Sequence, residues 1–383
     1  MSDSEPGDDT AGAAALGGLV IADFSRVLAG PYATMMLADL GAEVVKVERP
    51  DSGDDTRAWG PPFGPDGTAT YFAAVNRNKR SVSIDLATPA GQREARELIA
   101  SADVVVENFR DGTMERLGLG YDQVRDDELR GQRPELVYCS ITGFGRAGGA
   151  SLPGYDLLVQ AVGGLMSVTG SGSDEPVKVG VAVVDVLAGL HAAVGILAAL
   201  RHRDRTGAGQ RVDVDLFSVS LSSLVNQASA YLGAGVVPTA MGNRHPSIVP
   251  YQVFSTATRP IVLAVGNDAQ FARLAAVLGR PELADDPRFR SNADRVEHRD
   301  ALVTEIERSL TTADADHWYA ACTDAGVPAG PINSVADAFD LADELGIPAR
   351  ATIPGYPTPT TANPIRMSET PVRYRTPPPE LGP

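Results

Sequence analysis

Hydrophobic and polar positions follow two patterns in the first half of the chain. Short runs rich in β-branched residues predict buried strands at residues 19–24, 43–48, 81–86, 104–107 and 136–141. Between them, amphipathic spacing predicts helices at 31–40, with a proline in its first turn and a glycine after its end, and at 89–100. Strands that alternate with helices in this way favour an α/β fold with a parallel, doubly wound sheet.

A long apolar stretch occupies the middle of the chain. Residues 176–184 predict an extended segment, and residues 186–203 predict a helix whose polar face is narrow. Gly189 and Gly195 would let another backbone approach this helix closely. A cationic last turn and Gly207 end it, and a strand is predicted at 211–216.

The pattern changes near residue 226. A strand at 261–265 and helices near 268–279, 299–310 and 314–325 predict a smaller α+β domain over residues 226–330. Residues 331–383 are rich in proline and glycine and predict an irregular connecting segment. Residues 1–16 are acidic and predict a disordered tail. Residues 17–225 then form the large domain.

Composition narrows the classes of protein that the pattern allows. The net charge of −16 over 383 residues opposes broad association with nucleic acid or anionic lipid. No stretch reaches about 18 uninterrupted apolar residues, so we expect no membrane span. Cys139 and Cys322 follow no metal spacing and point to a reducing compartment, and we expect a cytoplasmic protein. The five histidines form no compact pair, and we expect no catalytic metal.

Several common catalytic signatures are missing from the sequence. The turn after the first predicted strand contains no Gly-x-Gly-x-x-Gly, which disfavours an NAD-dependent dehydrogenase. The sequence also contains no Gly-x-x-x-x-Gly-Lys-Ser/Thr phosphate loop and no Gly-x-Ser-x-Gly elbow. These absences disfavour nucleotide hydrolases and serine esterases of the common kinds.

Asp185 lies where the extended segment becomes a helix. A carboxylate there meets the unpaired amides of a helix start, so it either caps the helix or acts as an ionised, poorly hydrated nucleophile. Asp156 is interpreted as the cap of a helix at 157–166, and Tyr155 as a half-buried packing residue or a ligand. The polar cluster at residues 76–80 either holds phosphates or forms a solvated turn.

Several strings, taken in their order and spacing, resemble the class III CoA-transferase family, which includes formyl-CoA transferase, carnitine CoA-transferase and α-methylacyl-CoA racemase. Almost the whole chain is covered. The matching strings lie at residues 28–31, 40–49, 76–85, 102–110, 154–156, 179–190, 206–210, 242–247 and 325–331.

The resemblance implies that Asp185 is the nucleophile and that coenzyme A, as acyl-CoA, is the substrate. It implies a Rossmann-like large domain built from both chain ends, with residues 331–383 returning to it, and an interlocked homodimer. It also assigns the CoA-binding residues Ala29, Arg49, Lys79, Asn108, Phe109, Arg110, Arg116 and Tyr155. We therefore expect a CoA-transferase that moves CoA from an acyl-CoA to a free carboxylic acid through an aspartyl-CoA thioester.

Two alternatives are weighed against transfer. The racemase branch carries a histidine base where this chain has Tyr155, and a phenol of pKa ~10 is a poor substitute near neutral pH. A non-catalytic CoA-binding protein is the other alternative, and Asp185 argues against it. Leu28 replaces the glutamine of formyl-CoA transferase, so formyl-CoA specificity is not expected. Arg244 or His245 would meet a substrate carboxylate or form a turn, and the short C-terminus is expected to be loose.

Overall fold

A computed structural model describes residues 14–127, 131–172 and 174–383. Contacts within these residues group the chain into two compact units. The first unit contains the segments up to Met166, Lys178–Val237 and Gly346–Pro383, and the second contains Ser167–Val177 and Pro238–Leu345. Helix α9 (Val225–Ala234) falls in the first unit and α14 (Val335–Glu344) in the second, whereas the sequence analysis divided the chain at residues 225 and 330.

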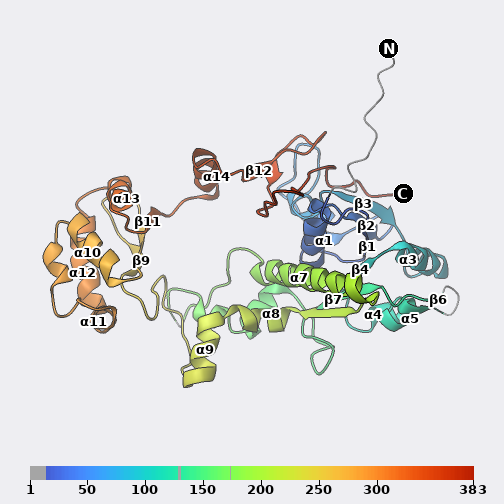
Figure 1. The fold of residues 1–383 in the computed structure, drawn as a ribbon, viewed down its shortest axis with the longest axis horizontal. Coiled ribbons are helices and arrows are strands. Elements are labelled where there is room, and N and C mark those ends of the chain that lie inside the picture. The colour runs from blue at the N-terminus through green and yellow to red at the C-terminus, as the bar shows by residue number, and fades with distance from the viewer. Residues whose placement is uncertain (1–13, 128–130, 173) are drawn as a thin grey trace, which may run out of the picture. The chain divides into compact units, whose positions relative to one another are not determined.

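A six-stranded parallel sheet forms the centre of the first unit (Figure 1). Its strand order is β3-β2-β1-β4-β7-β8, in which β1 is paired with β2 on one side and β4 on the other. The α/β class and the parallel sheet predicted from the sequence are confirmed. The strands are β1 (Val20–Asp23), β2 (Glu43–Glu48), β3 (Lys79–Ser83), β4 (Val104–Glu107), β7 (Val137–Thr142) and β8 (Arg211–Asp215).

Helices pack on the sheet through two apolar clusters. One cluster joins α1 (Ala29–Asp39) and α7 (Val183–Thr206) to the central strands, and the other joins α3 (Pro89–Ser101) to them. Gly189 of α7 explains the close packing of α7 against α1, because a Cβ there would lie 2.6 Å from the carbonyl oxygen of Ala29. Gly195 faces Val212 of β8 at a similar separation, 2.7 Å. The predicted close approach of a backbone is confirmed at Gly189, whereas the neighbour of Gly195 is the Val212 side chain.

Helix α7 is long and apolar. Among the described residues it alone has the length and hydropathy of a membrane span, with 24 residues and a mean hydropathy of 2.1. Ala188, Ala192 and Ile196 are fully buried in the cluster that α7 shares with α1 and the sheet. This apolar face of α7 thus forms part of the core of the first unit.

The start of α7 differs from the prediction. The helix begins at Val183 with Ala182 as its N-cap, so residues 176–182 form no strand and Asp185 is the third helical residue. Asp185 is therefore not the cap of its helix, and the capping interpretation was wrong. The run of valines before it favoured an extended segment, but a contact from another helix, described below, stabilises the helical start instead.

The polar cluster at residues 76–80 forms a largely buried turn that leads into β3. Four of its five side chains are buried, and Arg80 alone is exposed. The Arg77 guanidinium pairs with the Asp39 carboxylate at 2.6 Å, and the Asn78 amide donates to the same carboxylate at 2.8 Å. The solvated-turn interpretation was wrong, because acidic partners far away in sequence pair with Arg77 and Lys79 inside the protein. Phosphate binding by this cluster stays a prediction.

The C-terminal segment lies along the edge strand β3. The amide of Asn78 donates to the Thr376 carbonyl at 3.0 Å, and the amide of Ser83 donates to the Pro383 carbonyl at 3.3 Å. The Ser83 hydroxyl also donates to the Gly382 carbonyl at 2.6 Å. The expected loose C-terminus was wrong, because these bonds satisfy polar groups that the edge strand would otherwise leave unpaired.

The second unit is built on a small antiparallel sheet of order β11-β10-β9. Its apolar cluster packs α10, α12 and α13 on that sheet around Phe271, Leu302 and Trp318. The elements are β9 (Tyr251–Phe254), β10 (Ile261–Ala264), β11 (Ala329–Pro331), α10 (Asp268–Val277), α11 (Asn292–Glu297), α12 (Arg299–Leu310) and α13 (Ala315–Asp324).

The remaining elements are short. They are α2 (Thr70–Ala73), α4 (Thr113–Arg116), α5 (Tyr121–Arg125), α6 (Asp156–Val162), α8 (Leu216–Ser223), the strands β5 (Asp126–Asp127), β6 (Gly131–Gln132), β12 (Arg350–Ala351) and β13 (Thr360–Thr361), and the 3-10 turns η2 (Asp55–Ala58), η3 (Met166–Val168) and η4 (Pro281–Ala284).

Candidate active site

A cavity of about 200 Å³ opens at the carboxyl ends of β1, β4 and β7. Loops after parallel strands meet at this edge of the sheet, where α/β proteins commonly bind ligands. The cavity brings together six residues that the sequence analysis proposed for the site, namely Ala29, Asn108, Phe109, Arg110, Tyr155 and Asp185. Three others, Arg49, Lys79 and Arg116, do not line it.

Asp185 contributes the carboxylate of this cavity. None of the described residues donates a hydrogen bond to that carboxylate. Burial and, after it, the negative charge of Asp156 together raise the pKa of Asp185 to about 7. A carboxylate without hydrogen-bond donors and beside a like charge keeps its electron pair available for reaction. The sequence analysis treated Asp185 as an ionised carboxylate. Its pKa near 7 means that the protonated and ionised forms both exist at neutral pH.

Asp156 fixes the helix that carries Asp185. Its Oδ1 accepts the backbone N–H of Val184 at 2.9 Å and that of Asp185 at 3.3 Å. These two amides belong to the first turn of α7, which has no partners for them inside the helix. Asp156 is the first residue of α6, so it caps a helix other than its own. The sequence suggested only a local cap.

Tyr155 lies beside this contact. It is the N-cap residue of α6, and its side chain is 66% exposed and lines the cavity. The half-buried packing interpretation of Tyr155 was therefore wrong. A second tyrosine, Tyr71 on α2, is close enough to Asp185 for charge to act on it. Burial, followed by the charges of Asp185 and Asp156, raises the pKa of Tyr71.

Two polar side chains hold the loop after β1 against the loop after β4. The Asn108 amide accepts the Arg26 N–H at 2.8 Å and donates to the Arg26 carbonyl at 2.7 Å. The Arg26 guanidinium lies 5.0 Å from the centre of the Phe109 ring. The amide of Asn108 is thus occupied by the backbone, which makes this residue a support for the cavity wall.

Val27 in the same loop has an uncommon backbone. Its φ is +68°, a region that β-branched residues rarely adopt. The buried Asp54 carboxylate accepts the Val27 N–H at 3.3 Å and pairs with Lys46 at 2.8 Å, and both charged side chains are fully buried. Lys46 also donates to the Ser25 carbonyl at 2.9 Å. This ion pair holds a strained wall residue in place. Asp54 was missed because its sequence context reads as a polar turn.

Glu107 supports the wall of the cavity by hydrogen bonds. It is buried at the end of β4, where it accepts the Phe109 N–H at 2.9 Å and the Ser140 hydroxyl. Burial raises the pKa of Glu107 to about 7, and these two hydrogen bonds only partly offset the burial. The site therefore contains two carboxyl groups that titrate near neutral pH. Only two features of the sequence single out Glu107, namely its position in a predicted strand and its place in the matching string 102–110.

The three predicted ligands outside the cavity have other partners. Arg49 is exposed and pairs with Asp55, which does line the cavity. Arg116 is exposed and donates to the Thr113 hydroxyl at 2.8 Å. Lys79 has a fully buried side chain that pairs with Asp23 at 3.1 Å. The ammonium of Lys79 is therefore unavailable to a phosphate in this structure.

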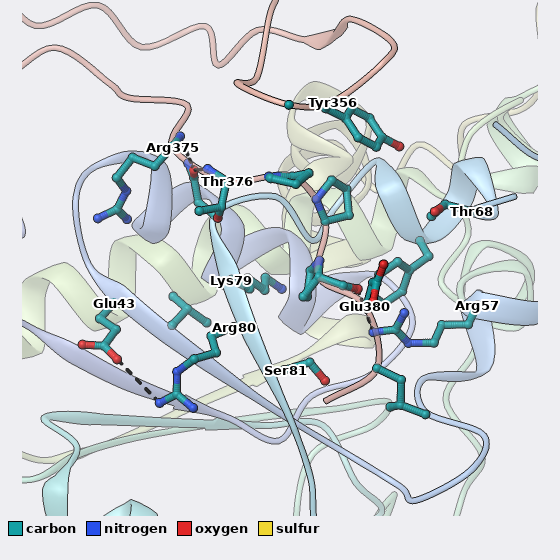
Figure 2. Close-up of a pocket in the computed structure, with 18 of the residues that line it drawn as sticks. Glu43, Arg57, Thr68, Lys79, Arg80, Ser81, Tyr356, Arg375, Thr376 and Glu380 are labelled. Carbon is teal, nitrogen blue, oxygen red and sulfur yellow. Dashed lines mark hydrogen bonds and ion pairs between the residues drawn. The ribbon is translucent and has the colours of Figure 1, made fainter. Parts of the chain in front are cut away.

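Lys79 and Arg80 lie instead at a larger cavity of about 1280 Å³ beside the edge strand β3. Figure 2 shows Arg80 directed toward Glu43, with which it forms an ion pair of 3.6 Å. The C-terminal residues Thr376 and Glu380 line the same cavity. Because Asp185 does not line it, size alone does not identify the reactive site.

Within the described residues, no group of three or more His, Cys, Asp or Glu side chains is arranged to hold a metal ion. A family model described as CoA-transferase family III matches residues 16–383. The chain belongs to CoA-transferase family III.

Relatives of this family III enzyme are similar over most of their length. The succinate–glutarate CoA-transferase of Agrobacterium fabrum is 44% identical over 381 residues, which cover 96% of this chain and 93% of that protein. The succinyl-CoA:glutarate CoA-transferase of Mus musculus is 42% identical over 96% of this chain and 84% of that protein. The resemblance stated from the sequence is confirmed, and the chain is a class III CoA-transferase.

A solved structure shares the fold. A CaiB/BaiF family protein from Brucella suis superposes with a TM-score of 0.85 at 42% identity, over 96% of this chain and 97% of that protein. The family III enzyme therefore uses acyl-CoA as its substrate, and the cavity that contains Asp185 is its candidate active site.

Proposed function

We propose that this enzyme transfers CoA between dicarboxylic acids, and that Asp185 carries the activated group as an aspartyl-CoA thioester. The observation that supports Asp185 most strongly is its position in the cavity as a carboxylate with no hydrogen-bond donor and a pKa of about 7. The dicarboxylic substrates are proposed because relatives over 40% identical bear names with succinate and glutarate.

The proposed reaction has four steps in which charge and atoms balance. The Asp185 carboxylate attacks the thioester carbonyl of the donor, and the C–S bond breaks to release CoA thiolate and leave a mixed anhydride. The thiolate attacks the Asp185 carbonyl of the anhydride, which frees the donor as a carboxylate and leaves aspartyl-CoA. The acceptor carboxylate attacks this thioester, and the released thiolate then attacks the acceptor carbonyl and restores Asp185.

The surroundings of Asp185 suit such a nucleophile. A carboxylate of raised pKa is more basic than an exposed one, and about half of it is ionised at pH 7. Apolar residues such as Phe144 and Leu152 also line the small cavity. Low access of water favours transfer over hydrolysis of the anhydride and the thioester.

Negative charge that develops on the attacked carbonyl oxygen needs donors. The cavity is bordered by Leu28 and Ala29, which form the N-terminus of α1. Amide groups in the first turn of a helix have no partner inside the helix, and they favour nearby negative charge. We propose that these amides stabilise the oxyanion during transfer.

The test of the function is a transfer assay. Purified enzyme is incubated with succinyl-CoA and glutarate, and the formation of glutaryl-CoA is followed by liquid chromatography and mass spectrometry. The proposal expects glutaryl-CoA, with no exchange of the substrate α-proton for deuterium in D₂O. Exchange of that proton without transfer would establish a racemase, and binding of CoA without either reaction would establish a binding protein.

Two further features are proposed from the family resemblance. An interlocked homodimer predicts a mass in solution of about twice the 40.1 kDa of the chain, measured by size-exclusion chromatography with light scattering. A cytoplasmic location predicts recovery of the native enzyme in the cytosolic fraction of its cells. A monomeric mass, or recovery elsewhere, would contradict the respective proposal.

A further inference from the structure

Five charged side chains border the cavity that contains Asp185. They are Arg26, Asp55, Arg110, Asp111 and Asp185. The Asp55 carboxylate pairs with Arg49 at 2.5 Å. The Asp111 carboxylate pairs with Arg146 at 2.9 Å. Neither Arg49 nor Arg146 lines the cavity, so two of the lining carboxylates are compensated from outside it, and the two lining arginines favour an anionic ligand.

The guanidinium of Arg26 has one weak partner. Within the part of the chain that the structure describes, Asp55 is the carboxylate that pairs with it, at 3.5 Å. Both side chains are partly exposed, and the shorter contact of Asp55 is the one with Arg49. Ion pairs between such groups at this distance contribute little free energy and are screened by salt. An anion in the cavity therefore replaces Asp55 at small cost.

The backbone that carries Arg26 is fixed. The side-chain amide of Asn108 binds both the N–H and the carbonyl of Arg26. Lys46 donates to the carbonyl of the preceding residue at 2.9 Å, and Asp54 accepts the N–H of Val27 at 3.3 Å. Three consecutive residues are thus held by three different side chains. A guanidinium on such a backbone is preorganised, which lowers the entropic cost of binding a ligand.

Phe109 adds a contact on the side chain of Arg26. The guanidinium carbon lies 5.0 Å from the centre of the Phe109 ring, and Phe109 also lines the cavity. A ring contacts one face of the planar guanidinium. The N–H groups lie at the edge of that plane, where one carboxylate accepts two of them side by side. The contact therefore places a bidentate donor at the wall of the cavity.

We propose that Arg26 binds the second carboxylate of the dicarboxylic substrate, the one that does not become linked to CoA. Arg26 and Asp185 border one cavity of about 200 Å³ within the first unit, so a short acid that fills it contacts both side chains. This inference rests on the proposed function and names the residue that distinguishes dicarboxylic from monocarboxylic acids. The other oxyanions that the enzyme meets are the phosphates of CoA, and the experiment separates them from carboxylates.

The experiment compares Arg26→Met with wild type on glutarate and on glutaramate. Glutaramate has the same length and carries a neutral amide in place of one carboxylate. We expect KM for glutarate to rise about tenfold or more in Arg26→Met, which corresponds to about 1.4 kcal/mol, while KM for glutaramate changes less than about twofold. Arg26→Lys should recover part of the affinity for glutarate, because it keeps the charge.

Two other arginines of the first unit serve as controls. Arg125 lies 5.8 Å from the centre of the Tyr121 ring and does not line the cavity, so Arg125→Met should leave both KM values unchanged. Arg110 is the other cation of the lining, and the family resemblance assigns it to CoA. Arg110→Met should therefore weaken the binding of free CoA and leave the ratio of the two KM values within about twofold of wild type.

Three outcomes would overturn the proposal. The first is an equal effect of Arg26→Met on glutarate and glutaramate. The second is a loss of affinity for free CoA in Arg26→Met, which would assign Arg26 to a phosphate. The third is a change in the ratio of the KM values in Arg110→Met but not in Arg26→Met, which would assign the carboxylate to Arg110.

Direct binding covers the case in which wild type transfers CoA to no dicarboxylic acid. Glutarate is then titrated calorimetrically into wild type and Arg26→Met, each saturated with free CoA. Binding to wild type that is about tenfold weaker in the variant supports the carboxylate site even where the proposed function fails. Absence of glutarate binding to wild type, or equal binding to both proteins, overturns the site.

Discussion

Asp23, which is buried, and Asp185, which is half-buried, are two carboxylates of the first unit with opposite properties. Burial raises the pKa of both, but at Asp23 the charges of Lys79 and Lys46 and hydrogen bonds from Ser25 and Thr34 outweigh burial and lower the pKa. At Asp185 none of the described residues is such a partner, and the charge of Asp156 adds to the effect of burial.

The difference shows what partners do for a buried charge. Asp23 accepts a hydrogen bond from the Thr34 hydroxyl at 2.6 Å and forms an ion pair with Lys79 at 3.1 Å. The ion pair joins the first strand to the edge strand of the sheet. Asp185 costs stability and keeps its reactivity, because its carboxylate is desolvated without compensation. Asp23 thus has a structural role, and the chemical role that we propose for Asp185 suits a carboxylate without such partners.

Replacement of Asp185 should produce the largest effect. Asp185→Ala is expected to lower kcat/KM for transfer by ~10³-fold or more, because no other described carboxylate occupies its place in the cavity. The affinity for free CoA should stay within about twofold of wild type. Asp204→Ala, at the other end of α7, serves as the matched control. Transfer at the wild-type rate by Asp185→Ala would contradict the proposal that Asp185 is the nucleophile.

Replacement of Asp23 should produce the largest loss of stability. Asp23→Asn leaves the buried Lys79 ammonium without its anion, and we expect a loss of about 3–5 kcal/mol in the free energy of unfolding at pH 7. The folded pKa of Asp23 is lowered, so its contribution exists above the unfolded pKa and declines as the pH falls below it. Urea unfolding at pH 7 and at about pH 3, below the unfolded pKa of 3.8, measures both. An unchanged midpoint at pH 7 would contradict the structural role.

The matching change at Asp185 should act in the opposite direction. Asp185→Asn is expected to raise the free energy of unfolding by roughly 2–4 kcal/mol at pH 8, because the carboxylate has a folded pKa of about 7 against 3.8 in the unfolded chain. The folded state binds the proton more tightly, so the gain should shrink as the pH falls toward 4. A destabilised variant at pH 8 would show that Asp185 has a partner.

Removal of the neighbouring charge should produce the smallest effect. Asp156→Asn keeps an oxygen that accepts the amides of Val184 and Asp185 but removes the like charge, so the pKa of Asp185 should fall. The acidic limb of the profile of kcat/KM against pH should therefore move to lower pH. Glu107 also titrates at about 7, and Asp156→Asn leaves it in place. An unmoved limb would assign the titration to another group.

Local patterns predicted much of the fold. The limits of β2, β4 and α12 agree with the sequence analysis to the residue, because each is a clear apolar run or an amphipathic repeat. The start of α7 was missed by three residues because Asp156, 29 positions before Asp185, supplies the acceptor for the first turn. A contact of that sequence separation leaves no mark in a local pattern.

The candidate site shows the same limit. Residue types and their order, read through the resemblance to the family, were sufficient to select Asp185, Tyr155 and Phe109, which the structure brings to one cavity. They were insufficient for Lys79, because its burial depends on Asp23, a partner from another strand. They also gave no sign of Asp54, whose ion pair with Lys46 supports the strained Val27.

The most direct test of the account is the mass of the Asp185 peptide during turnover. The enzyme is mixed with succinyl-CoA in the absence of acceptor, quenched with acid and digested, and the peptides are analysed by mass spectrometry. The account predicts a CoA adduct on Asp185 that disappears when glutarate is added before the quench. An enzyme that transfers CoA while this peptide stays unmodified at every time point would contradict it.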